Sequence, residues 1–280
     1  MISRTLSVGL RQGYLRGANS NDGRLNEGYS RLGRKSRSRH NSGTGLAILV
    51  MVMLAALVFG AVRTIIGTKD VVYETVDIPK DILDFVDNNP EAEEYAKGYA
   101  LYANADIDIN INDEIGESGI PLFIQWDKRW GYKSYGKNYI GVAGCGPTCI
   151  AMVACGLTRD DSINPYVVSN FADEQGYYTY GQGTSWSLMD VGAEQFGIAG
   201  ISGIINEDYI LENLSEESPM ICSMKPGDFT SSGHFIVLAG IDSDGKIIVN
   251  DPNSPKNSEK HWDVDILVDQ MKAIWVYSKL

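Results

Sequence analysis

The sequence predicts an α+β domain that follows one N-terminal transmembrane helix. Residues 46–62 form an apolar run without a charged side chain, and residues 150–154 continue as an apolar helix after a turn. Two β-branched runs, 235–241 and 246–250, flank Asp244 and Gly245, which is a strong hairpin signal. A helical part followed by antiparallel strands is the order of elements that is typical of the α+β class.

Charge is distributed unevenly along the chain. Residues 1–43 contain nine Lys or Arg side chains and two acidic ones, although the whole chain has a net charge of -12. Because this segment is basic, polar and poor in apolar residues, we expect it to be disordered. An Arg-rich arm can bind nucleic acid. Beside an apolar run, however, membrane topology and anionic lipid explain the charge better, so we expect no nucleic-acid partner.

Residues 44–66 are predicted to form a single transmembrane helix. About 20 apolar residues, at about 1.5 Å each, cross the hydrocarbon core of a bilayer. A cleaved signal peptide begins with a short basic stretch, whereas 43 residues precede this run. Five basic residues at positions 31–39 precede the run, and only Arg63 and Lys69 closely follow it. The positive-inside rule therefore places residues 1–43 in the cytoplasm and the rest of the chain outside the cell membrane.

Residues 67–117 are predicted to form an acidic stalk with two short helices. Apolar side chains at positions 82, 83, 85 and 86 suggest the first helix, and Pro90 followed by acidic residues marks the start of the second. Oxygen-bearing side chains in residues 106–117 are spaced roughly as in a calcium loop. Ile111, however, stands where such a loop needs glycine, so a strand or linker is favoured over a calcium site.

Residues 144–149, which read GCGPTC, suggest a nucleophilic thiol. Pro147 suits a first helical turn, so Cys145 is expected at the N-terminus of a helix. Unpaired backbone N–H groups and the helix dipole favour a thiolate there. The alternative is a small buried hydrophobic residue. Cys149 lies one turn deeper on the same helical face and is expected to pack rather than react.

A nucleophilic thiol needs a base, and residues 118–280 offer His234 and His261. His234 precedes an apolar strand, and Asp251 follows the partner strand at the end that returns toward His234. The carboxylate of Asp251 can accept the second imidazole N–H and stabilise the imidazolium. His261 follows a polar Pro/Asn/Lys turn and is expected in an exposed loop. Because the cysteines lack a zinc-type pairing with histidines, we expect no metal and no other cofactor.

Residues 118–280 resemble the C39-like cysteine peptidases of the papain superfamily, particularly their membrane-anchored bacterial branch. The matching segments are IPLFIQWDKRW (120–130), GCGPT (144–148), TSWSLM (184–189), GHFIVL (233–238) and NDP (250–252). The resemblance implies a papain-like fold, in which a helical lobe that carries the nucleophile packs on an antiparallel sheet.

The resemblance also implies catalytic roles for four residues. Cys145 would be the nucleophile, His234 the general base and then acid, and Asp251 the residue that orients His234. Gln125, together with the backbone N–H of Cys145, would form the oxyanion hole. In transporter-linked members of the family the corresponding glutamine lies nearer its cysteine than Gln125 lies to Cys145.

The implied activity is hydrolysis of peptide bonds through a thioester intermediate, by an enzyme anchored in the cell membrane and acting outside the cell. The substrate is a peptide or protein, and an exported peptide, a leader peptide or a cell-wall peptide crosslink all stay open. Two alternatives remain. One is a catalytically idle papain-like protein for surface binding or scaffolding. The other is a cell-wall peptide hydrolase or amidase, although wall amidases of another papain-like family usually carry a second histidine where Asp251 stands.

Overall fold

The structure, a computed structural model, describes residues 77–280 of the chain. The predicted cytoplasmic segment at 1–43 and the predicted transmembrane helix at 44–66 lie outside the described residues, and both stay predictions. Within residues 77–280, no helix has the length and apolar character that crossing a bilayer requires.

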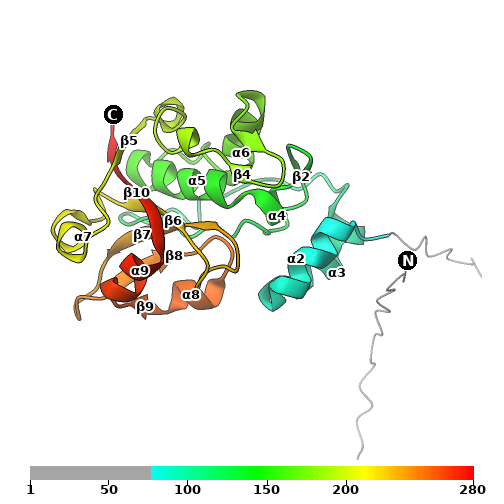
Figure 1. Ribbon diagram of the computed structural model, residues 1–280. Coiled ribbons are helices and arrows are strands. Elements are labelled where there is room, and N and C mark those ends of the chain that lie inside the picture. The colour runs from blue at the N-terminus through cyan, green and yellow to red at the C-terminus, as the bar shows by residue number, and fades with distance from the viewer. Residues whose placement is uncertain (1–76) are drawn as a thin grey trace, which may run out of the picture. The chain divides into compact units, whose positions relative to one another are not determined.

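A six-stranded antiparallel sheet forms the centre of the fold (Figure 1). Its strands, in spatial order, are β5 (Ile198–Ser202), β10 (Met271–Lys279), β6 (Met220–Met224), β7 (His234–Ile241), β8 (Ile247–Asn250) and β9 (His261–Trp262). The predicted hairpin is confirmed as β7 and β8. Its turn is closed by Asp242, whose carboxylate accepts the N–H groups of Asp244 and Lys246. Gly245 has a φ of 78°, a backbone conformation that glycine adopts without steric cost.

Helices α5 (Cys145–Thr158) and α6 (Pro165–Glu174) cover one face of this sheet. The sequence of α5 is apolar all round, and the helix is accordingly buried on every side from Gly146 to Gly156. Phe235 and Val237 of β7 contribute to the core cluster that contains α5. The helix predicted after the turn at Cys145 is therefore confirmed, and it packs directly on the strand that begins at His234.

Helices α7 (Glu207–Asn213) and α9 (Val264–Gln270) cover the opposite face of the sheet (Figure 1). Ile236 and Leu238 of β7 contribute to this second core, with Ile210 of α7 and Leu267 of α9. Successive residues of β7 thus enter different cores, which explains why its sequence is a continuous apolar run. The expected helical lobe on an antiparallel sheet is present, and the structure adds a second helical layer.

Two helices precede the sheet domain, as the sequence predicted. They are α2 (Lys80–Asn88) and α3 (Glu93–Tyr102), joined by the short 3-10 helix η1 (Pro90–Ala92). The Tyr95 hydroxyl of α3 donates a 2.7 Å hydrogen bond to the carbonyl of Gly131, and the Tyr132 hydroxyl donates one of 2.7 Å to the carbonyl of Tyr95. Since Tyr95 and Tyr132 are both buried in one cluster, α3 is packed against the domain that follows.

Residues 103–117 form no strand, so the linker is the alternative that the structure supports. Ile111 is buried in the main core, where it anchors this extended segment. Arg129 holds the segment from the other side, because it donates to the carbonyl of Asn110 and pairs with Glu114 at 2.6 Å. Within residues 77–280, no group of His, Cys, Asp and Glu side chains is arranged to hold a metal ion.

Short elements complete the connections. They are β1 (Ser134–Tyr135), β2 (Asn138–Tyr139), α4 (Ile140–Ala143), β3 (Tyr178–Thr179), β4 (Gly183–Thr184), η2 (Trp186–Leu188), η3 (Ala193–Phe196) and α8 (Pro255–Glu259). Two of these adjoin residues with predicted roles. α4 leads directly into Cys145, and α8 follows Asp251 within the same loop region.

Candidate active site

Cys145 is the first residue of α5 and is partly exposed. Its neighbour Gly146 lies against Thr184, and a Cβ atom added at Gly146 would be 2.8 Å from the Thr184 side chain. Thr184 is itself fixed by a 2.9 Å hydrogen bond to the hydroxyl of Tyr135. The second glycine of the GCGPT motif is therefore required for the close approach that places the helix start at this point.

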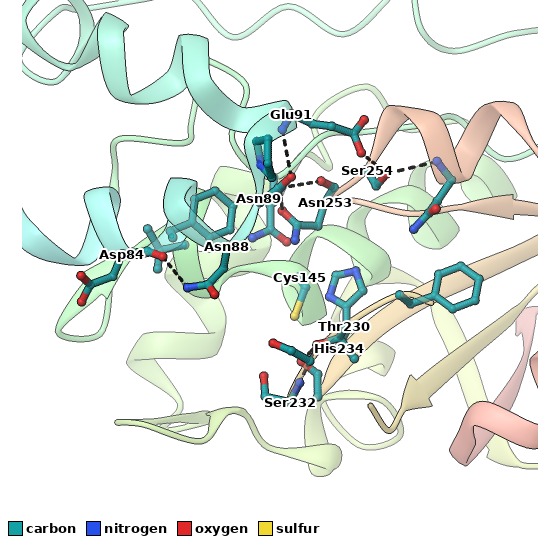
Figure 2. A pocket seen from close by; sticks show the side chains of 18 of the residues that line it. Asp84, Asn88, Asn89, Glu91, Cys145, Thr230, Ser232, His234, Asn253 and Ser254 are labelled. Carbon is teal, nitrogen blue, oxygen red and sulfur yellow. Dashed lines mark hydrogen bonds between the residues drawn. The ribbon is translucent and has the colours of Figure 1, made fainter. Parts of the chain in front are cut away.

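His234 is the first residue of β7 and is 7% exposed. Its Nε2 forms a 2.7 Å hydrogen bond with Oδ1 of Asp251. The other ring nitrogen, Nδ1, is thereby left for Cys145. Figure 2 shows the imidazole ring of His234 beside the side chain of Cys145. The register of the β7–β8 hairpin pairs Val237 with Asn250, so it brings the residue after β8 back to the start of β7.

Asp251 is fully buried and is held by three donors. Oδ1 accepts the N–H of Asn253 at 2.8 Å in addition to the bond from His234, and Oδ2 accepts Nδ2 of Asn257 at 2.9 Å. A carboxylate with both oxygens bonded has a fixed orientation. Asp251 therefore aligns the imidazole ring of His234 toward Cys145.

The pKa values of Cys145 and His234 are shifted in opposite directions. Burial raises the pKa of the Cys145 thiol, but a hydrogen bond and charge from His234, with the N–H groups of Phe235 and Gly146, bring the pKa below its usual value. Burial lowers the pKa of His234, but the charge and hydrogen bond of Asp251, together with those of Cys145, have the larger combined effect and raise the pKa to about 10. Both shifts favour a thiolate beside an imidazolium.

Gln125 is 2% exposed and lines the same pocket as Cys145 and His234. Its Nε2 donates a 2.9 Å hydrogen bond to the carbonyl of Gly141. The opposite amide orientation would turn Oε1 toward that carbonyl, so the contact assigns which atom is nitrogen. An amide nitrogen carries two hydrogens, so one remains beyond the bond to Gly141.

The NDP motif at residues 250–252 joins three parts of the site. Nδ2 of Asn250 donates to the carbonyls of Ile120 and Pro121, at 2.9 Å and 3.1 Å. Asp251 bonds to His234, and the carbonyl of Pro252 accepts the N–H of Gln125 at 2.8 Å. The motif thus holds the segment that carries Gln125 against the strand pair that carries His234.

A pocket of about 760 Å³ opens over these residues (Figure 2). Its walls come from α2 and η1, from the loop at 227–233, and from Asn253, Ser254 and Asn257 around the start of α8. Gln125, Cys145 and His234 line it, whereas Asp251 lies behind His234. The structure thus brings the four residues chosen from the sequence into one place, and their catalytic roles stay a prediction.

The sequence interpretation missed the residues that hold Asp251. Residues 255–259 are a short helix, α8, and not only the polar turn that we expected before His261. From it, Asn257 bonds to the carboxylate of Asp251, and the Ser258 hydroxyl accepts the Asp251 N–H at 2.9 Å. The pattern Ser254-Pro255 is a helix-start signal, with the serine as N-cap and the proline at the first helical position, and it predicts this helix.

His261 is exposed, as expected, but it begins the edge strand β9 and does not lie in a loop. Its Nδ1 pairs with the carboxylate of Asp242 at 2.5 Å, in the turn between β7 and β8. This pair involves none of the pocket residues.

The other cysteines differ from Cys145. Cys149, Cys155 and Cys222 are buried, and all four cysteines are free thiols. Burial raises the pKa of Cys155 to about 11, and it raises the pKa values of Cys149 and Cys222 as well. Packing, and not reactivity, therefore describes these three thiols, as the sequence suggested for Cys149.

A search of curated proteins finds no match. The peptidase C39-like family matches residues 117–279, which is more than half of the chain and includes Gln125, Cys145, His234 and Asp251. The chain therefore belongs to the peptidase C39-like family.

Proposed function

We propose that this protein is a cysteine peptidase that hydrolyses peptide bonds with Cys145 as nucleophile, His234 as acid and base, and Asp251 as the residue that orients His234. The observation that carries the proposal is the 2.7 Å bond between His234 and Asp251, together with the hydrogen bond between His234 and the Cys145 side chain. Membership of a peptidase family supports a peptide or protein as the substrate.

Acylation begins with attack of the Cys145 thiolate on the carbonyl carbon of a peptide bond. The carbonyl oxygen becomes an oxyanion as the carbon becomes tetrahedral. The His234 imidazolium then gives its Nδ1 proton to the leaving amine nitrogen, and the C–N bond breaks. The acyl group is left on Cys145 as a thioester.

Deacylation restores the enzyme. The now neutral His234 takes a proton from a water molecule, whose oxygen attacks the thioester carbonyl. The C–S bond breaks, which releases the carboxylic acid product and regenerates the thiolate beside the imidazolium. Asp251 stabilises the positive charge on His234 at each stage in which the ring is protonated.

Gln125 is proposed to stabilise the oxyanion in both steps. Its contact with Gly141 fixes the amide, and its place in the pocket lining allows the second Nε2 hydrogen to reach a developing negative charge. The backbone N–H of Cys145, at the start of α5, is the second donor.

We also propose that residues 44–66 anchor the protein in the cell membrane and that residues 77–280 act on the outer side. The basic residues before the apolar run support this orientation. An exported peptide, a processed leader or a cell-wall peptide would then be within reach of the pocket.

Digestion of a peptide library, followed by mass spectrometry of the products, tests the activity. Full-length wild-type protein is expected to produce cleaved peptides, and the Cys145→Ala variant is expected to produce none. A digest of cell-wall material serves as a second substrate arm. Equal cleavage by both proteins would overturn the assignment, and the absence of cleavage by the wild type on both substrates would favour the idle binding protein.

A further inference from the structure

Residues that precede the family domain contact the loop that carries the triad carboxylate. Nδ2 of Asn89 donates to the carbonyl and to Oδ1 of Asn253, at 2.9 Å and 2.8 Å. The Glu91 carboxylate accepts the hydroxyl of Ser254 at 2.6 Å and the N–H of Lys256 at 3.1 Å. Figure 2 shows Asn89 beside Asn253 and Glu91 beside Ser254 at the edge of the pocket.

The same loop holds Asp251 from its other side. The N–H of Asn253 and Nδ2 of Asn257 each bond to one carboxylate oxygen of Asp251. The Ser254 hydroxyl donates to Glu91 and also accepts the N–H of Asn257 at 3.1 Å. A continuous chain of hydrogen bonds therefore runs from Glu91 through Ser254 and Asn257 to Asp251.

These contacts join parts of the chain that are far apart in sequence. Asn89 and Asn253 are 164 positions apart, and the matched family region begins at residue 117. Both Asn89 and Glu91 also line the pocket together with Cys145 and His234. The segment around η1 thus lines the pocket and also forms hydrogen bonds with the residues that follow Asp251.

We propose that Asn89 and Glu91 are positioning residues for the catalytic machinery. They hold residues 253–257, which comprise the end of the loop after Asp251 and the start of α8, so that Asp251 keeps His234 aligned with Cys145. The inference rests on the proposed function of that site. It means that the functional unit begins with α2 and η1, ahead of the region that the family comparison covers. Of the two residues, Glu91 is expected to contribute more to holding this segment, because its carboxylate forms charge-assisted hydrogen bonds with the Ser254 hydroxyl and the Lys256 N–H.

The test measures the rate of Cys145 alkylation by iodoacetamide against pH in the full-length chain. The midpoint of that profile reports the pKa of the Cys145 thiol. At a fixed pH below the midpoint, a rise of one unit in the midpoint slows alkylation about tenfold, because the thiolate fraction falls by that factor. For Glu91→Gln we expect a higher midpoint and alkylation about threefold to tenfold slower at pH 6. The matched control is Glu93→Gln, because Glu93 is exposed and pairs only with Lys97 among the residues described.

The direction in which the alkylation midpoint shifts distinguishes a loss of positioning from the direct electrostatic effect of removing the Glu91 charge. Removing a negative charge at the pocket edge favours the thiolate by itself, so a pure charge effect would lower the midpoint. Loss of positioning weakens the support of Asp251 for the imidazolium and raises the midpoint. A lower or unchanged midpoint in Glu91→Gln would therefore overturn the inference.

Two further variants guard against misfolding. Asn89→Ser adds no charge and keeps a side-chain oxygen that can accept the Glu91 N–H, but it loses the amide donor to Asn253, so the midpoint should also rise. Ser254→Ala breaks the chain from the other side and should act in the same direction. If the wild type shows the midpoint of an ordinary thiol, the proposed function fails. If the wild-type midpoint is low and folded Glu91→Gln does not raise it, the positioning role alone fails.

Discussion

Nε2 of His234 and Oδ1 of Asp251 lie 2.7 Å apart, between the first residue of β7 and the residue that follows β8. The hairpin turn at Asp242 and Gly245 sets the register that brings them together. The pair is almost completely buried, so its interaction is only weakly screened by solvent. An imidazolium held in this way beside a thiol is the basis of the proposed chemistry.

We expect Asp251→Asn to reduce peptide hydrolysis on the order of 10⁴-fold, as loss of the triad carboxylate does in other enzymes. The amide keeps the size of the side chain but lacks the charge that stabilises the imidazolium. Steady-state cleavage of a library-derived peptide provides the measurement. Asp242→Asn is the matched control, since an amide oxygen can still accept the N–H groups of the turn, and the other carboxylate oxygen bonds, within residues 77–280, only to exposed His261. A rate for Asp251→Asn within tenfold of wild type would contradict the role of Asp251.

Gln125→Ala should lower kcat by about 10²–10³-fold, because it removes an oxyanion donor. The same variant should leave the alkylation profile of Cys145 almost unchanged, since iodoacetamide forms no oxyanion in its reaction. Both rates are to be measured on protein whose circular dichroism matches the wild type. Equal losses in hydrolysis and alkylation would indicate that Gln125 serves only to support the fold.

Gly146→Ala should destabilise the protein by about 1–3 kcal/mol, the usual range for overpacking a filled core. The added Cβ would lie 2.8 Å from Thr184, which Tyr135 holds in place. Gly240→Ala is the control, because the nearest atom to its added Cβ is a side-chain carbon of Ile248 at 3.9 Å. Urea unfolding compares the two variants, and equal midpoints would show that the space at Gly146 is not restricted.

Membrane orientation is tested by adding protease to intact cells that express the full-length chain. We expect residues 77–280 to be degraded without permeabilisation, because the positive-inside rule places them outside. A cytoplasmic protein in the same cells serves as the control for leakage. Degradation that begins only after permeabilisation would place the domain inside and reject the proposed topology.

Local signals explain which parts of the site could be predicted. Pro147 and the apolar residues after it indicated the helix, and Asp244-Gly245 indicated the hairpin, because turn chemistry and side-chain periodicity act over a few residues. The pairing of His234 with Asp251 followed from that hairpin. These features needed no knowledge of distant contacts.

The parts that escaped prediction depend on long-range packing. Helices α7 and α9 are seven residues each, too short for a clear periodic signal, and their place is decided by the far face of the sheet. The order of the sheet inserts β10 between β5 and β6, which no local pattern specifies. The bond between Asn89 and Asn253 likewise joins polar residues that look like ordinary turn residues in the sequence.

The central claim is that Cys145 is the activated thiol, and mapping the site of alkylation against pH tests it most directly. Iodoacetamide is applied to the folded wild-type protein across the pH range, and tandem mass spectrometry assigns the modified cysteine. Since His234 lowers the pKa of Cys145 and burial raises those of the other three thiols, we predict labelling of Cys145 alone, with a midpoint below that of a free thiol. Preferential labelling of Cys149 or Cys155, or a Cys145 midpoint at or above the free-thiol value, would contradict the account.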